Sequence, residues 1–360
     1  MSSRADSRVV AGAALLALGG FAAGYALERR LVSRRWRRAE EVDEPFFTLR
    51  TAGPVVITPD GVRLHTEVEL PEPENDHGPT LVFVHGFAMG SDCWHFQRRH
   101  LRGRHRMIFY DQRSHGRSSR SAPELSRIPQ LAVDLAQVLQ EVAGAEPVIL
   151  IGHSMGAMAI MELARHHPEW FGATEAVDGV GPIVGVGLVC TASDDLVDDH
   201  PIRGLPNRAA ARIVEPTLDA LIRIPATVAR TRTTDSDLSH LITRQLSFPS
   251  KVPPSYVGFA QALLATMPLE VIAEFLPAFA GLDLSEALPV IRRVPMAVVG
   301  ARQDLVTAVR HTELMMETLT EAEQLILEPC GHLAMIEHHR EVNRLLERLI
   351  ERARTTSAQQ

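Results

Sequence analysis

Short apolar runs recur along most of the chain and are polar only at their ends. They lie at 81–84, 107–110, 148–152, 183–189, 296–299 and 325–327. Such runs are typical of parallel strands that are covered on both faces. Two further apolar stretches, 55–58 and 62–70, flank Pro59-Asp60-Gly61 and predict a hairpin before the first run.

Stretches of helical periodicity separate these runs. Apolar residues recur three and four positions apart over 128–142, 154–167, 311–319 and 334–350. The alternation of strand and helix predicts an α/β fold, with a mostly parallel sheet, helices on both faces and right-handed crossovers.

One long interval interrupts the alternation. Between Cys190 and Pro295 no strand pattern occurs, and spacings such as Leu218, Leu221 and Ile222 indicate helix. We therefore expect an inserted helical cap. The predicted organisation is an N-terminal segment at 1–38, a linker at 39–53, a first core part at 54–190, the cap at 191–294, a second core part at 295–353 and a tail at 354–360.

The N-terminal segment has the length and composition of a membrane span. Residues 9–27 are 19 consecutive uncharged, mostly apolar residues, about 28 Å as a helix. Six Arg follow within residues 28–38, and the positive-inside rule then predicts one transmembrane helix with the body in the cytoplasm. Two alternatives remain open. The segment could be a signal peptide cleaved near Gly24-Tyr25-Ala26, with export of the body, or a soluble or surface-lying extension.

Charge is distributed unevenly. Residues 1–38 hold eight Arg against one Asp and one Glu, which gives this segment a net charge of +6. Because the whole chain has a net charge of −7, the rest of the chain carries −13. An acidic body argues against nucleic acid as a partner. The three cysteines, Cys93, Cys190 and Cys330, form neither a disulfide framework nor a metal-ligand spacing.

Gly152-His153-Ser154-Met155-Gly156 has the pattern G-x-S-x-G and stands between a predicted strand and a predicted helix. In that context it predicts a nucleophile elbow, a strained turn that exposes the Ser154 hydroxyl at the end of the sheet. Ser is a weak nucleophile on its own, so a base must lie nearby.

His332 and Asp304 are the candidate partners of Ser154. His332 follows the last predicted strand, where Gly331 leaves the loop free to turn, and Asp304 follows the strand before it. Asp304 would orient His332 and stabilise its imidazolium form. The competing interpretation of Asp304 is an N-cap of a helix at 305–319. Two backbone N–H groups, of Met155 and Phe87, are the candidate oxyanion hole.

These residues make the chain resemble the α/β-hydrolase fold superfamily over about residues 50–350. The supporting motifs are the turn at 85–87, the loop 110–118, the elbow at 152–156 and Gly-His at 331–332. Asp111 and Arg113 look structural in that family. Two departures occur, because Ser114 stands where Gly is common and Gly300 precedes Asp304 by four residues rather than three. With its N-terminal segment, the chain also resembles membrane-anchored α/β hydrolases of high-GC actinobacteria.

The resemblance implies a serine hydrolase of carboxylic esters that needs no metal or organic cofactor. The aliphatic cap and the N-terminal segment favour a small-molecule ester that is apolar or lipid-like. Epoxide hydrolases of this fold use a carboxylate nucleophile, and Ser154 argues against that chemistry. Haloperoxidase or perhydrolase chemistry, thioester or C–C hydrolysis, and a non-catalytic ligand-binding role remain alternatives.

Overall fold

A computed structural model describes residues 43–75, 78–196, 243–244 and 247–357. The predicted anchor at 1–38 and much of the predicted cap lie outside the described residues. Contacts divide the chain into two units, one of residues 1–44 and 252–255 and one of 45–251 and 256–360. The elements below belong to the second unit, except for the first two residues of α8.

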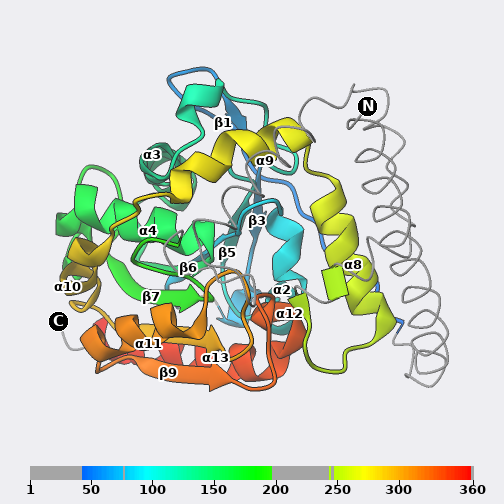
Figure 1. Cartoon of the computed structure of the whole chain (residues 1–360). Coiled ribbons are helices and arrows are strands. Elements are labelled where there is room, and N and C mark those ends of the chain that lie inside the picture. The colour runs from blue at the N-terminus through cyan, green and yellow to red at the C-terminus, as the bar shows by residue number, and fades with distance from the viewer. Residues whose placement is uncertain (1–42, 76–77, 197–242, 245–246, 358–360) are drawn as a thin grey trace, which may run out of the picture. The chain divides into compact units, whose positions relative to one another are not determined.

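Seven strands form the central sheet (Figure 1), in the order β3-β5-β4-β6-β7-β8-β9. Only β3 is antiparallel to its neighbour, β5, and the other adjacent pairs are parallel. The strands are β3 (Thr66–Glu69), β4 (Thr80–Val84), β5 (Met107–Tyr110), β6 (Val148–His153), β7 (Ile183–Val189), β8 (Met296–Ala301) and β9 (Glu323–Leu327). The predicted mostly parallel sheet is therefore confirmed.

The predicted hairpin forms, but it is shorter than expected and is followed by a separate strand. Strands β1 (Val56–Ile57) and β2 (Arg63–Leu64) pair antiparallel, but the chain then leaves the hairpin and continues into the large sheet as β3. The loop after β5 binds the backbone at the break, since Asp111 N donates to His65 O at 2.9 Å and His65 N donates to Ser118 Oγ at 2.8 Å. The expected second strand at 62–70 is thus two strands.

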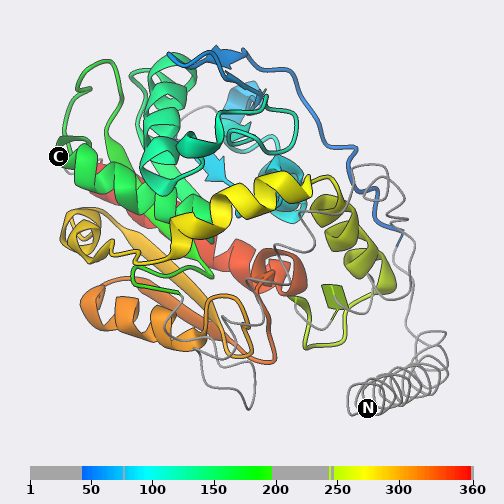
Figure 2. The same cartoon turned by 45° about the horizontal axis from the view of Figure 1, so that its top comes forward.

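Helices cover both faces of the sheet. On one face α3 (Ile128–Val138) lies beside α4 (Met155–His166), as Figure 2 also shows, and α10 (Leu288–Ile291) and α11 (Val309–Thr318) continue that layer. The opposite face carries α2 (His95–Leu101) and α13 (His339–Ser357). Strand β7 has Gly187 under α13, where a Cβ would already contact Leu346 and Leu349 at 3.4–3.5 Å.

One helix was missed, and two helix predictions need adjustment. The sequence pattern did not indicate α2. The expected helix at 334–350 is divided into α12 (Ala334–Glu337) and α13, and α13 runs four residues into the predicted tail at 354–360. The expected helix at 305–319 begins only at Val309, with Ala308 at its N-cap position, so Asp304 does not cap it.

The described part of the predicted cap is helical, with α8 (Pro254–Ala265) and α9 (Leu269–Phe275), followed by short helical turns. Within the described ranges, no single helix is long and apolar enough to cross a membrane. In the part of the chain that the structure describes, α8 and Leu269–Phe279 meet that length and composition when taken together, but they are bent by 79°.

Part of the predicted linker at 39–53 packs against the domain. The Phe46 ring stacks on Phe259 of α8 with centroids 4.1 Å apart. Further along, the backbone N–H of Val68 in β3 donates to the carbonyl of Ala52 at 3.2 Å. Ordered packing against the core therefore extends nearly to the start of the described residues.

Candidate active site

Ser154 occupies a strained turn between β6 and α4. Its φ of 50° and ψ of −121° lie in a region that non-glycine residues rarely adopt, at a cost of about 1–3 kcal/mol. Neighbouring contacts fix this conformation, because Ser154 N donates to Val189 O at 3.0 Å and Thr191 Oγ1 donates to Ser154 O at 2.9 Å.

The two glycines of the motif allow close packing around this turn. A Cβ on Gly152 would lie 2.6 Å from the Ala157 backbone. A Cβ on Gly156 would lie 2.3 Å from the carbonyl oxygen of Val84 and 2.5 Å from that of His85. The first turn of α4 therefore rests directly on the end of β4, which a larger residue would prevent.

The structure brings His332 and Asp304 together at the carboxyl edge of the sheet. His332 Nδ1 lies 2.8 Å from Asp304 Oδ2, and the Asp304 side chain is fully buried. Burial alone would raise the pKa of Asp304, but the charge of His332 and hydrogen bonds from His332, Val306 and Thr307 hold it below its ordinary value. An ionised carboxylate accepts a proton from Nδ1, which leaves Nε2 as the ring nitrogen available for the predicted base role of His332.

His153 places His332 next to the elbow. Their ring centroids are 4.7 Å apart, and His153 Nε2 donates to the backbone carbonyl of His332 at 2.9 Å. Burial first, and then the charge of His332, lower the pKa of His153 to about 3. His153 is therefore neutral, and because it directly precedes Ser154, its hydrogen bond links the His332 loop to the elbow.

Glu337 holds the other side of the same loop. Its carboxylate accepts the N–H of Gly331 at 2.7 Å and that of Ser250 at 2.8 Å. A Cβ on Gly331 would lie 2.5 Å from the Ser247 carbonyl oxygen. Gly331 is thus required by the close approach of the segment at 247–250, which differs from the expected role in freeing the loop to turn.

The predicted oxyanion donors come from two adjacent segments. Strands β4 and β6 pair with Val84 opposite Gly152, which brings the loop at Phe87 next to the elbow. Gln112 Nε2 donates to the carbonyl of His85 at 2.6 Å and thereby fixes that loop. Met155 is the first residue of α4, where backbone N–H groups have no acceptor within the helix.

The Phe87 side chain faces the cap. Its ring lies 6.1 Å from that of Phe275 in α9 and 5.5 Å from that of Phe279, and the His115 ring lies 5.1 Å from Phe275. An aromatic cluster therefore joins the residue that carries one predicted oxyanion donor to the described part of the cap.

The loop at 110–118 has structural contacts, as the resemblance implied for Asp111 and Arg113. Asp111 accepts the N–H of Ser91 at 2.7 Å, and fully buried Arg113 binds Asp134 through two hydrogen bonds of 2.6 and 2.7 Å. Ser114 has a φ of 63°, the left-handed conformation that explains why Gly is common there.

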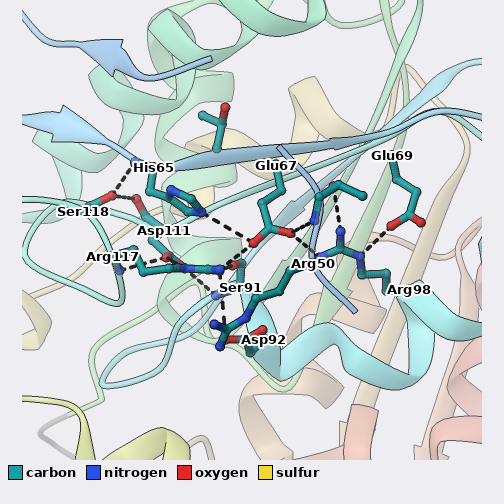
Figure 3. A network of polar contacts seen from close by, with 12 residues as sticks. Arg50, His65, Glu67, Glu69, Ser91, Asp92, Arg98, Asp111, Arg117 and Ser118 are labelled. Atoms are coloured by element: carbon teal, nitrogen blue, oxygen red, sulfur yellow. Dashed lines mark hydrogen bonds and ion pairs between the residues drawn. The ribbon is translucent and has the colours of Figure 1, made fainter. Parts of the chain in front are cut away.

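A network of charged side chains joins this loop to the first strands (Figure 3). Arg117 bridges Asp111 and Glu67, with N–O distances of 3.1 and 2.6 Å. Glu67 and Glu69 lie two residues apart on β3, so both side chains point to the same side and both bind Arg98 of α2 at 2.6 Å. This network fixes the segments beside the predicted oxyanion loop.

The sequence pattern did not indicate roles for Thr307, His153 or Glu337. In the structure they contact Asp304, His332 and the His332 loop, respectively. The available signal was weak. Glu337 is a single acid in the otherwise apolar Ala-Met-Ile-Glu of α12, and His153 lies within the elbow motif. Among the residues that the structure describes, no group of three or more His, Cys, Asp or Glu side chains could hold a metal ion.

Known proteins share this sequence pattern and this architecture. Epoxide hydrolase B of Mycobacterium tuberculosis is 33% identical over 132 residues, which is 36% of this chain and 35% of that protein. The chain thus aligns with about a third of that relative's length. A thermophilic esterase from Thermogutta terrifontis has a TM-score of 0.63 at 20% identity, over 85% of this chain and 100% of its own.

A bromoperoxidase from Bacillus anthracis also has a TM-score of 0.63, at 18% identity, over 84% of this chain and 100% of its own. At such identities, the two structures demonstrate a shared fold. The alpha/beta hydrolase family matches residues 81–345, a span that includes the elbow, Asp304 and His332. The chain therefore belongs to the alpha/beta hydrolase family.

Proposed function

We propose that the protein is a serine hydrolase of carboxylic esters, with Ser154, Asp304 and His332 as its catalytic triad. Ser154 Oγ attacks the ester carbonyl while His332 Nε2 takes its proton, and the Met155 and Phe87 N–H groups stabilise the oxyanion. His332 then protonates the departing alcohol. Water, deprotonated by His332, cleaves the acyl-enzyme and releases the acid.

One observation carries this proposal. Ser154 has a strained backbone at the start of α4, and the adjacent His153 binds the carbonyl of His332, whose ring is paired with buried Asp304 at 2.8 Å. Backbone strain of this kind is characteristic of functional turns, and a buried, ionised acid on Nδ1 gives the tautomer that a general base needs.

The surroundings support an apolar ester as substrate. Phe87, Phe275 and Phe279 form an aromatic cluster beside the predicted oxyanion loop. Although epoxide hydrolase B is among the relatives, the elbow here carries Ser rather than a carboxylate, which supports acyl transfer over epoxide opening.

The test is turnover by the full-length protein of p-nitrophenyl esters of increasing acyl length, with an epoxide and a peracid-forming assay in parallel. We expect ester turnover, labelling by a fluorophosphonate, and loss of both in Ser154→Ala. Ser126→Ala, at a buried serine in another loop, is the matched control and keeps both. Absence of ester turnover together with unlabelled Ser154 would refute the proposal.

We also propose that residues 1–38 anchor the protein to a membrane, with the hydrolase domain in the cytoplasm. The apolar stretch at 9–27 and the six Arg that follow support this orientation. Full-length protein should remain in the membrane fraction after alkaline carbonate washing, and a protease added outside spheroplasts should leave the domain intact. Recovery of the full-length chain in the high-speed supernatant contradicts the anchor, and cleavage near residue 26 supports export instead.

A further inference from the structure

Thr307 contacts the proposed catalytic acid and lies against the proposed base. Its Oγ1 donates to Asp304 Oδ2 at 2.8 Å, the same oxygen that accepts the His332 Nδ1 proton at 2.8 Å. Thr307 Oγ1 also lies 3.4 Å from His332 Nδ1, and the residue is only 1% exposed. The hydroxyl is therefore buried from solvent and lies beside the Asp304–His332 hydrogen bond.

The same residue binds the other oxygen of the carboxylate. The backbone N–H of Thr307 donates to Asp304 Oδ1 at 2.9 Å, next to the N–H of Val306 at 2.7 Å. Two groups of one residue thus bind the two oxygens, which prevents the carboxylate plane from rotating. The peptide N–H is available from any non-proline residue, whereas the hydroxyl depends on the side chain at 307.

We propose that Thr307 is a positioning residue for the triad, whose hydroxyl fixes Asp304 Oδ2 against His332 and limits the basicity of His332. This inference rests on the proposed function. A donor on the carboxylate oxygen withdraws part of its negative charge. Without the hydroxyl, the carboxylate stabilises the imidazolium form of His332 more strongly but is held less firmly in the geometry needed for catalysis.

The titratable groups around the pair are identified by the structure. They are Asp304 itself, neutral His153, the carboxylate of Glu337 on the His332 loop and the thiols of Cys190 and Cys330. Burial raises the pKa of both thiols well above neutrality. With those thiols uncharged, a change in the titration of His332 on altering Thr307 reports on the Asp304–His332 pair.

The experiment compares full-length Thr307→Val, which replaces the hydroxyl with a methyl group, with Thr307→Ser, which retains it. Thr312→Val is the matched control, because Thr312 is equally buried in α11, where its side chain lies against Gly300 of β8. Ester kcat/KM and the rate of fluorophosphonate labelling are measured against pH. In parallel, His332 is titrated by NMR in protein carrying ¹⁵N-histidine, with His332→Gln to assign its signal.

We expect Thr307→Val to lower kcat about tenfold with little change in KM, since a hydrogen bond to a charged group is lost. The acidic limb of the profile and the NMR titration of His332 should both move to higher pH. Thr307→Ser should restore both values to near those of the unaltered protein, and Thr312→Val should leave them unchanged.

A His332 titration that stays in place in Thr307→Val, or moves to lower pH, would overturn the inference. If Thr307→Val does not fold, Thr307→Ala is measured in the same way and the same outcomes apply. Failure of the proposed function is recognised separately, since the unaltered protein would then neither turn over esters nor label at Ser154. The NMR titration would still show whether the Thr307 hydroxyl controls His332.

Discussion

Glu67 is a fully buried carboxylate whose removal should make the stability of the protein less dependent on pH. Its oxygens lie 2.6 Å from nitrogens of Arg98 and of Arg117, and one of them also accepts the backbone N–H of Thr51 at 2.8 Å. Glu67→Gln keeps the shape of the side chain and removes its charge. The two guanidinium groups then lose a buried counter-charge.

The magnitude follows from the pKa of Glu67. Burial alone would raise that pKa, but hydrogen bonds from His65, Thr51 and Arg98, with the charge of Arg98, outweigh burial and lower it from 4.5 to about 2. Because one pKa unit corresponds to about 1.36 kcal/mol, the ionised group contributes about 3 kcal/mol of folding free energy at neutral pH. A lowered native pKa means that this contribution is present above pH 4.5 and is lost as the pH falls towards 2.

Urea unfolding measures this contribution. Two of the three tryptophans, Trp94 and Trp170, are buried, so their fluorescence reports unfolding of the domain. At pH 7 Glu67→Gln should be less stable than the unaltered protein by about 3 kcal/mol, and the difference should shrink steadily between pH 4.5 and 2.5. Glu124→Gln, at an exposed glutamate, is the control, with an expected change within about 0.5 kcal/mol.

The reasoning is refuted if the free energies of unfolding of Glu67→Gln and of the unaltered protein differ by the same amount at every pH. Such parallel curves would mean that Glu67 titrates alike in the folded and unfolded states. Other carboxylates also titrate in this range, so the comparison uses the difference between the two proteins rather than either curve alone.

Three further predictions concern the elbow and the His332 loop. Gly156→Ala should lower ester kcat/KM by about 10²–10³, because its Cβ would lie 2.3 Å from the Val84 carbonyl oxygen and would displace the proposed oxyanion donors. Unchanged kinetics would contradict this packing. His153→Gln should keep at least tenfold more activity than His153→Leu, since only Gln can donate to the His332 carbonyl, and equal activities would argue against that bond. Glu337→Gln should lower the free energy of unfolding in urea by about 1–3 kcal/mol, because its amide nitrogen cannot accept a backbone N–H. An unaltered urea midpoint would show that the hydrogen bonds from Gly331 and Ser250 contribute little.

Much of the fold could be predicted because buried strands and amphipathic helices have distinct local periods. The run at 148–152 and the stretch at 154–167 became β6 and α4 with ends shifted by about one residue. The strand prediction failed where contacts with a segment distant in sequence determine the path of the backbone. The stretch at 62–70 has one continuous strand pattern, yet the loop after β5 binds the backbone at His65 and redirects the chain from the hairpin into the sheet.

The candidate site shows the same division. The order of Ser154, Asp304 and His332 at strand ends was readable, because the carboxyl ends of parallel strands meet at one edge of a sheet. The helix expected at 305–319 begins four residues later, at Val309, and the turn before it lets Thr307 donate to both oxygens of Asp304. A capping pattern does not reveal which atoms a loop will place around a buried carboxylate.

The sequence by itself determined the alternation of strand and helix, the position of the elbow between β6 and α4, and the uneven charge of residues 1–38 and the rest of the chain. Only the tertiary structure decided that Glu67 meets Arg98 and that His153 meets His332, since these partners are 31 and 179 residues apart. The physical reason is that a local pattern records which side chains avoid water, whereas a buried polar group needs a partner that only the packing of distant segments can supply.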